Sequence, residues 1–195
     1  MTRRGGGVSA TPAGRIRERT MAGVLSQTFL ELLAARKRTI AEDWLARTLR
    51  TYPEHTSGFL SREKDPFRNP VGNSLKEAFP ALVDQLIMGP DASTVCCLLD
   101  PVVRIRAVQD FSAGQAVAFI FLLKQAVREA LKDDICTRPD REGLAAIEAR
   151  IDEMALVAFD LFMRCRERIH EIKAGEAKRK LAMLERMQGN GGEAR

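Results

Sequence analysis

The sequence predicts an all-α protein, a helical bundle with a long C-terminal helix extending from the globule. Three observations support the prediction. Apolar residues recur at helical spacing through most of the chain, helix-starting and helix-ending residues separate these stretches, and the segment from about 140 to 187 contains no proline. The 195 residues, 45% of them apolar, suit one domain of ordinary size with extensions.

The positive charge is concentrated at the two ends of the chain. Residues 1–20 hold five Arg and one Glu, and residues 164–195 hold nine Lys or Arg and five acids, so the net charge of +5 leaves a mildly acidic middle. A nucleic-acid interface instead gathers its cations on the folded surface among aromatic residues. The longest apolar run, 116–123, is far shorter than the roughly 20 residues of a spanning helix. We expect neither nucleic-acid binding nor a membrane span.

The first twenty residues predict a disordered basic tail, because Gly, Pro, Ser, Thr and Arg leave almost nothing to bury. Three interpretations stay open. Arg3-Arg4 resembles the start of a twin-arginine signal, although no apolar stretch follows it. The tail is otherwise an arm that touches an anionic surface, or a linker with Met21 as the true start. In each case we expect residues 1–20 to be dispensable for folding.

The first long helix is predicted from about 24 to 52. In its middle Arg36, Lys37 and Arg38 interrupt the apolar stripe and predict a bend or a break. The triplet is either an anion site or a solvated face, and we favour the solvated face. Residues 53–70 contain three prolines and predict a surface loop. The side chains expected to pin that loop are Phe59, Leu60 and Phe67.

A second helix is predicted over residues 71–88, with a stop at Gly89-Pro90. Pro80 lies inside this stretch and is predicted to kink or split the helix. Asp91 or Ser93 is expected to cap the short helix that follows, since Asp and Ser accept hydrogen bonds from free amides at a helix start.

Two further helix starts are predicted in the middle of the chain. Asp100-Pro101 predicts a fresh start with Asp100 as its cap, because Pro suits the first turn. Ser112 and Gln115 have the spacing of a capping box in front of the apolar run. That run leaves little polar surface, so we expect other helices to cover most sides of it.

The final helix is predicted to change character near Cys165. Before this point its apolar stripe is broad, and beyond it only isolated apolar residues stand among dense charge. A helix with this pattern leaves the globule and faces a partner or water. The isolated apolar positions are Ile169, Ile172, Leu181, Leu184 and Met187.

A search for catalytic and metal motifs returns none. The Gly5-Gly6-Gly7 run lacks the surroundings of a phosphate loop. His55 and His170 are far apart and set among polar residues, which predicts solvated histidines, with neither zinc nor haem. The cysteines lack knuckle spacing, and without a signal peptide we expect reduced, buried thiols in a cytoplasmic protein. These cysteines are Cys96, Cys97, Cys136 and Cys165. The sequence thus predicts no catalytic, cofactor or metal residues.

Four stretches carry a family resemblance between about Leu25 and Met187. They are Ile40-Ala-Glu-Asp-Trp44, Asn69-Pro-Val-Gly72, Leu99 to Ser112 with Gln115-Ala116, and Ala158 to Ile169. On these residues the chain resembles the RsbRD N-terminal domain family, the sensory domains joined to co-antagonists of the RsbT kinase in bacterial stress signalling. The resemblance implies a globin-like bundle without haem, a dimer, and a role in receiving a signal.

The fuller members of that family append a STAS domain of about a hundred residues, for which this sequence has no room, so a stand-alone member is expected. We divide the chain into a tail (1–20), a helical sensor-like domain (21–168) and a helical extension with a frayed end (169–195). The expected function is a non-enzymatic regulatory domain that binds a small ligand or a partner protein. A purely structural helical dimerisation module is the alternative. Fold alone cannot name the signal.

Overall fold

The computed structural model describes residues 25–52, 57–58, 60, 62–63, 65, 68–109 and 111–190. The expectations for residues 1–20, Met21, His55, Phe59 and Phe67 lie outside the described residues. Leu60 is described, and it is buried as predicted, with 4% of its surface exposed.

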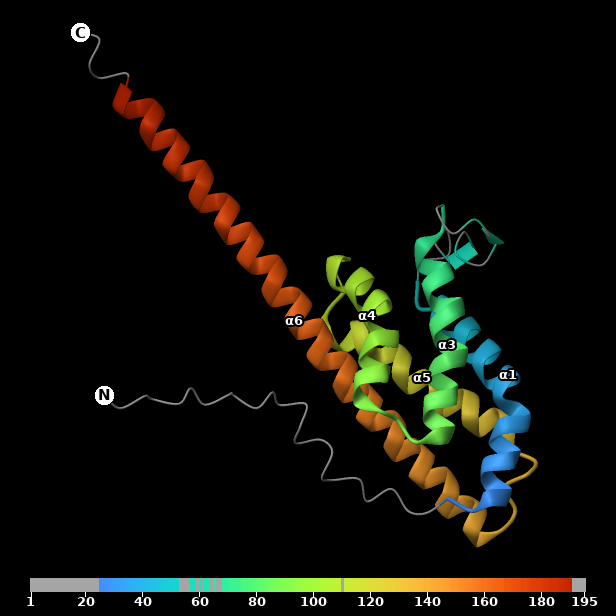
Figure 1. Ribbon diagram of the computed structural model, residues 1–195. Coiled ribbons are helices and arrows are strands. Elements are labelled where there is room, and N and C mark those ends of the chain that lie inside the picture. Colours follow the sequence, from blue (N-terminus) through green and yellow to red (C-terminus); the bar gives the residue numbers. More distant parts are fainter. Residues whose placement is uncertain are drawn as a thin grey trace, which may run out of the picture.

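The described part of the chain is built from helices that pack around one apolar core (Figure 1). Helix α6 packs on α4 and α5, helix α1 packs on α3 and α5, and α3 also contacts α4. The prediction of an all-α, globin-like bundle with a long C-terminal helix is confirmed. The helices are α1 (Gln27–Leu49), α3 (Pro70–Met88), α4 (Ala92–Val108), α5 (Ala113–Leu131) and α6 (Arg138–Asn190).

A stack of aromatic rings joins three of these helices. The Trp44 ring of α1 lies 3.6 Å from the Phe79 ring of α3, centroid to centroid, and 6.2 Å from the Phe119 ring of α5. The indole Nε1 of Trp44 donates a hydrogen bond of 2.6 Å to the carbonyl oxygen of Phe119. A buried indole N–H needs such a partner, so this hydrogen bond fixes the orientation of the Trp44 ring within the core.

Side-chain caps set the start of four of the five described helices. Ser26, Asn69, Asp91 and Ser112 accept hydrogen bonds from backbone amides at the N-termini of α1, α3, α4 and α5. Ser112 and Gln115 form the predicted capping box in full. The end of α3 also agrees with prediction, because Gly89 adopts a φ of 99° that other residues rarely reach.

The predicted helix start at Asp100-Pro101 is wrong. Helix α4 continues through Pro101 without interruption, and Asp100 is no cap but forms an ion pair of 2.6 Å with Arg104 on the next turn. Proline inside a helix costs about 3 kcal/mol. Burial of an apolar side chain returns about 1.5–3 kcal/mol each, and α4 buries Val95, Leu99, Val102 and Val103. Tertiary packing therefore outweighs the local signal.

Two other predicted interruptions are absent as well. Helix α1 runs unbroken through the basic triplet, whose members find acidic partners: Arg36 pairs with Asp134, Lys37 with Asp84 and Arg38 with Glu42. The triplet is thus an ion-pairing face and not an anion site. Helix α3 likewise continues through Pro80 and is not split, held by buried residues on both sides of the proline.

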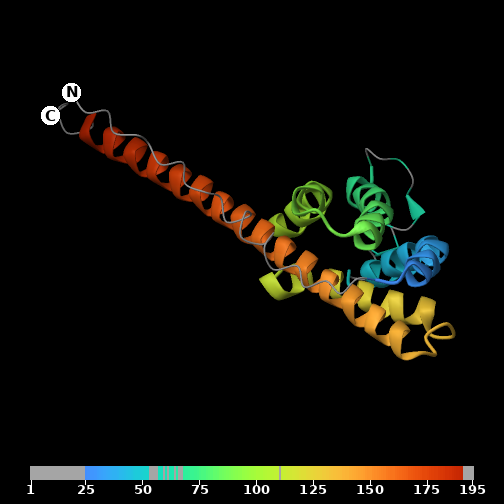
Figure 2. The ribbon, with the colours of Figure 1, turned by 60° about the horizontal axis from the view of Figure 1, so that its bottom comes forward.

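Helix α6 is 53 residues long and leaves the bundle along its second half. Its last fully buried side chain is Phe162, and from His170 onward nearly every described side chain is exposed. Figures 1 and 2 both show this half projecting away from the other helices. The predicted change of character near Cys165 is confirmed.

The Asn69-Pro-Val-Gly72 stretch ties the preceding segment to the start of α3. The Asn69 side chain is buried; its Nδ2 donates to the carbonyl oxygens of Leu60 (2.8 Å) and Glu63 (2.9 Å), and its Oδ1 accepts from the Gly72 amide (2.8 Å). A Cβ on Gly72 would meet the Asn69 side chain and would lie 2.7 Å from the Leu60 carbonyl oxygen. Only glycine fits there.

We expect Gly72→Ala to destabilise the fold by about 1–3 kcal/mol, the usual range for overpacking a tight site. Gly114→Ala is the matched control, since a Cβ at that helical position meets nothing within 4 Å. Urea denaturation of the two variants measures the difference. Equal stability of the two variants would show that the contact at Gly72 relaxes freely.

Candidate functional site

Arg106 is the largest buried charged side chain in the described part of the chain. It lies in the last turns of α4, and its exposed fraction is 0%. Arginine is almost never fully buried unless it is paired with an acid. Its burial makes this position the strongest candidate for a functional site.

Three aromatic rings surround the Arg106 guanidinium. Its central carbon lies 4.9 Å from the ring centroid of Tyr52, 5.2 Å from that of Phe111 and 4.7 Å from that of Phe119. These residues come from the segment after α1, from the connection before α5, and from α5 itself. Aromatic faces carry negative charge density and therefore stabilise a cation. We call these three rings and Arg106 the arginine cage.

The hydrogen bonds of Arg106 satisfy only part of its donor capacity. One terminal nitrogen donates to the Gln115 carbonyl oxygen at 3.2 Å, and the other donates to Thr51 Oγ1 at 3.3 Å. Its buried Nε has no hydrogen-bond partner. Among the described residues, no carboxylate lies within ion-pair distance of Arg106. Burial lowers the pKa of this guanidinium, and the nearby phenol of Tyr52 partly offsets the change.

Further unpartnered polar atoms lie on the residues around the arginine cage. Thr48 Oγ1, Tyr52 Oη and Gln109 Oε1 are buried and make no hydrogen bond of acceptable geometry. Thr48 is linked to Arg106 through the Thr51 hydroxyl, which donates to the Thr48 carbonyl oxygen and accepts from Arg106, and Gln109 follows Arg106 by about one turn. An unpartnered buried polar atom costs about 1–3 kcal/mol. Native proteins keep few such atoms, so a group of them beside a buried cation calls for an explanation.

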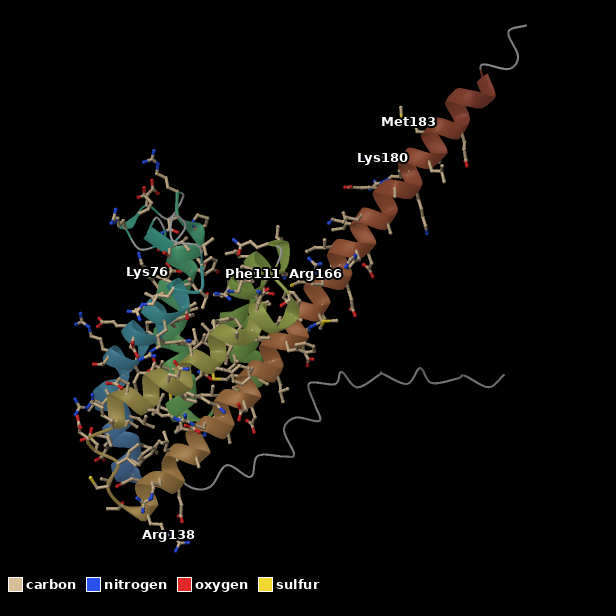
Figure 3. The ribbon with its side chains drawn as sticks, turned by 180° about the vertical axis from the view of Figure 1, so that it is seen from behind. Lys76, Phe111, Arg138, Arg166, Lys180 and Met183 are labelled. Atoms are coloured by element: carbon tan, nitrogen blue, oxygen red, sulfur yellow. The ribbon has the colours of Figure 1, made fainter. Side chains whose placement is uncertain are left out.

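Two arginines of α6 hold the C-terminal ends of neighbouring helices. Arg150 donates to the carbonyl oxygens of Leu86 (2.8 Å) and Ile87 (3.2 Å) at the end of α3. Arg166 donates to the Ala107 carbonyl oxygen at 3.2 Å, at the end of α4. Figure 3 labels Arg166 at the level where α6 leaves the bundle. Because Ala107 follows Arg106, the arginine cage and the projecting helix are attached to the same turn of α4.

A groove of about 360 Å³ lies between α4 and α6 beside this attachment. Its lining combines the cations Arg104, Arg164 and Arg168 with apolar side chains and Cys165. Burial raises the pKa of the Cys165 thiol, so the thiol is a poor nucleophile at neutral pH. The groove therefore contains no activated sulfur.

The cysteines and His170 are placed as follows. Cys97 and Cys136 are exposed, and Cys96 and Cys165 are partly buried. None of the four is fully buried, so the expectation of buried cysteines is wrong. His170 is exposed on α6, as its charged neighbours predicted.

The described part of the chain shows neither a cluster of metal ligands nor a membrane-spanning helix. Within the described ranges, no group of three or more His, Cys, Asp or Glu is arranged to hold a metal ion. No helix of the described chain combines the length and the apolar content that crossing a bilayer demands.

The fold defines an all-α domain with a helical extension. Residues 38–176 match the model of the RsbT co-antagonist protein rsbRD N-terminal domain, which covers well over half of the chain. The chain belongs to this family, a family of sensory domains in stress signalling. Comparisons with curated proteins and with solved structures found no match.

Sequence reasoning missed the arginine cage. The helical spacing places Arg106 on the same face of α4 as Leu99, Val102 and Val103, all of which are buried. This position on the apolar face was the feature of the sequence from which the burial of Arg106 could have been predicted. The aromatic partners, however, lie at sequence separations that no periodicity connects.

We expect Thr48→Val to raise the free energy of unfolding by about 0.5–1 kcal/mol, because it replaces an unpartnered buried hydroxyl with a methyl group of similar shape. Thr51→Val is the matched control. It removes a hydroxyl that donates to the Thr48 carbonyl oxygen (2.7 Å) and accepts from Arg106, so it should cost about 1 kcal/mol. Urea denaturation compares the two. Equal losses in both variants would mean that Thr48 has a partner.

Proposed function

We propose that this protein is a non-enzymatic sensory domain that binds a small ligand or a partner protein in its bundle and passes the resulting state along α6. Membership of a family of sensory domains supports the signalling role. We further propose that the helical domain ends near residue 168 and that residues 169–195 are its output extension.

The observation that carries this proposal is the exposure of apolar side chains on the projecting half of α6. Ile172, Leu181 and Met183 are 48%, 58% and 64% exposed. A rod of charged residues would need none of them. Their presence supports contact between this helix and another polypeptide.

Two apolar lines run along the projecting helix on opposite sides. At 100° per residue, Ile169, Ile172 and Met183 continue the face that α6 buries against the bundle through Leu161 and Cys165. The opposite line contains exposed Ala174, Ala177 and Leu181. We assign the first line to a partner protein and the second to a second copy of this chain.

The second line continues onto an apolar surface of the bundle. Leu156, Phe159 and Met163 lie within about 60° of Ala174, Ala177 and Leu181 around the helix axis, and they are 64%, 41% and 39% exposed. Figures 1 and 2 both show α5 beside the first half of α6.

Phe121 of α5 widens this surface. Lys124 pairs with Asp152, and Arg128 pairs with Glu148, so α5 and α6 run antiparallel. This register places Phe121, which is 47% exposed, level with Leu156. The continuity from bundle to projecting helix supports a symmetric dimer, in which each α6 faces its own copy. We define Phe121, Leu156, Phe159 and Met163 as the dimer surface.

The alternative is a purely structural dimerisation module. It would use the same dimer surface but would have no reason to keep a fully buried arginine to which the described part of the chain brings no carboxylate. The arginine cage therefore favours the sensory role.

Truncation after Arg168 tests the extension. We expect the shortened chain to stay folded and dimeric, with a melting temperature within a few degrees of the full chain, because no described side chain beyond Phe162 is fully buried. Circular dichroism and light scattering measure both properties. Unfolding would place the segment in the core, and a monomer would make the extension the main dimer seam.

Leu156→Glu tests the dimer surface. A charge at the centre of an apolar interface should shift the protein to monomers at micromolar concentration. Met88→Glu is the matched control, since Met88 is 72% exposed at the end of α3, away from this surface. Analytical ultracentrifugation gives the mass. A monomeric wild type, or a Leu156→Glu variant as dimeric as the control, contradicts the assignment.

A further inference from the structure

We propose that the arginine cage binds a small monocarboxylate, whose carboxylate group pairs with the Arg106 guanidinium. This inference rests on the proposed sensory function, because it gives the chemical class of the ligand. The juxtaposition that carries it is a fully buried guanidinium with an unpartnered Nε, the Tyr52 ring beside it, and Thr48 linked to it through the Thr51 hydroxyl.

The donors at the cage define an acceptor. Arg106 Nε, Tyr52 Oη and Thr48 Oγ1 can all donate, and none makes a hydrogen bond of acceptable geometry, although the Tyr52 phenol lies close enough to the guanidinium to raise its pKa. A carboxylate offers two oxygens with about four lone-pair positions, and its plane matches the fork of a guanidinium. One such group would therefore satisfy the guanidinium edge and the hydroxyls, and it would compensate the buried charge.

The surroundings limit the charge and size of the ligand. The rings of Tyr52, Phe111 and Phe119 cover the guanidinium, so only its edge remains for contact. A single negative charge balances the single cation. A dianion such as sulfate would leave excess charge among aromatic faces, at a large desolvation cost. We infer a short acid with an apolar remainder.

The fourth unpartnered atom refines this choice. Gln109 Oε1 only accepts hydrogen bonds, so a carboxylate does not serve it. An acid with a hydroxyl group beside its carboxylate would serve it as well. We therefore expect lactate to bind more tightly than propionate of the same chain length.

The residues around Arg106 indicate how a ligand would enter the cage and how its binding would act on α6. Phe111 is partly exposed, while Tyr52 and Phe119 are buried, so Phe111 is the ring of the cage that faces solvent, and we assign ligand access to its side. Arg106 is followed by Ala107, whose carbonyl oxygen holds Arg166 of α6. A ligand that shifts Arg106 therefore acts on the turn to which the projecting helix is attached.

The test is the melting temperature of the full chain in acetate, propionate and lactate, with chloride and sulfate at matched ionic strength as references. We expect a saturable rise of roughly 3–5 °C at ten times the dissociation constant of the carboxylate. Chloride and sulfate should give no such rise. Isothermal titration calorimetry of the best acid then measures the affinity directly.

Three variants make the result specific. Arg106→Met should abolish the carboxylate response, and Thr48→Val, which keeps the fold by the argument above, should weaken it several-fold. Arg150→Met is the matched control and should respond like the wild type, because Arg150 is a second partly buried arginine with an unpartnered Nε outside the cage. Should Arg106→Met not fold, Arg106→Lys retains the charge without the fork and should bind at least tenfold more weakly.

The proposal is overturned if no carboxylate raises the melting temperature, if chloride raises it equally, or if Thr48→Val and a folded Arg106 variant respond like the wild type. These results leave the proposed function intact when truncation after Arg168 still gives a folded dimer. Conversely, a carboxylate response in a chain whose extension proves to be part of the core would retain the ligand site and remove the output helix.

Discussion

The ring of Phe119 contacts both the aromatic residues of the core and the buried cation, and the packing of the helices depends on these two contacts. It runs nearly parallel to Trp44 and Phe79, and its own carbonyl oxygen accepts a hydrogen bond from the Trp44 indole. The same ring lies against the Arg106 guanidinium. Since these residues belong to α1, α3, α4 and α5, one side chain couples the centre of the core to the arginine cage. A change at the cage cannot stay local, because close-packed interiors transmit displacement.

The four stretches that carry the family resemblance coincide with the most constrained contacts of the structure. Trp44 donates to a buried carbonyl, and Asn69 closes around Gly72 where no Cβ fits. Arg106 is the buried cation, and Arg166 holds the end of α4. Each of these residues is fixed by a polar contact or a steric limit and not by hydrophobicity alone. Such positions tolerate few replacements.

Local chemistry predicted the helices well where it acted within one turn. The caps at Asp91 and Ser112, the stop at Gly89 and the thinning of the apolar stripe of α6 all concern neighbours in sequence. The helices are not divided at Pro80 or at Asp100-Pro101 for one reason, because burial of the surrounding apolar side chains exceeds the local cost of proline. The arginine cage was out of reach for another reason. Arg106 contacts three rings, one carbonyl oxygen and one hydroxyl that come from other segments of the chain, and no pattern in a single sequence indicates these contacts.

The attachment of α6 at two helix ends makes the projecting half a lever arm. From Ile169 to Asn190 the helix extends about 30 Å at 1.5 Å per residue. Arg150 and Arg166 fix its base against α3 and α4. A tilt of about 5° at this pivot would move the far end by about 2.5 Å, close to half of a helical pitch. A displacement too small to rearrange the bundle is thus large enough at the tip to change which side chains of a partner it meets.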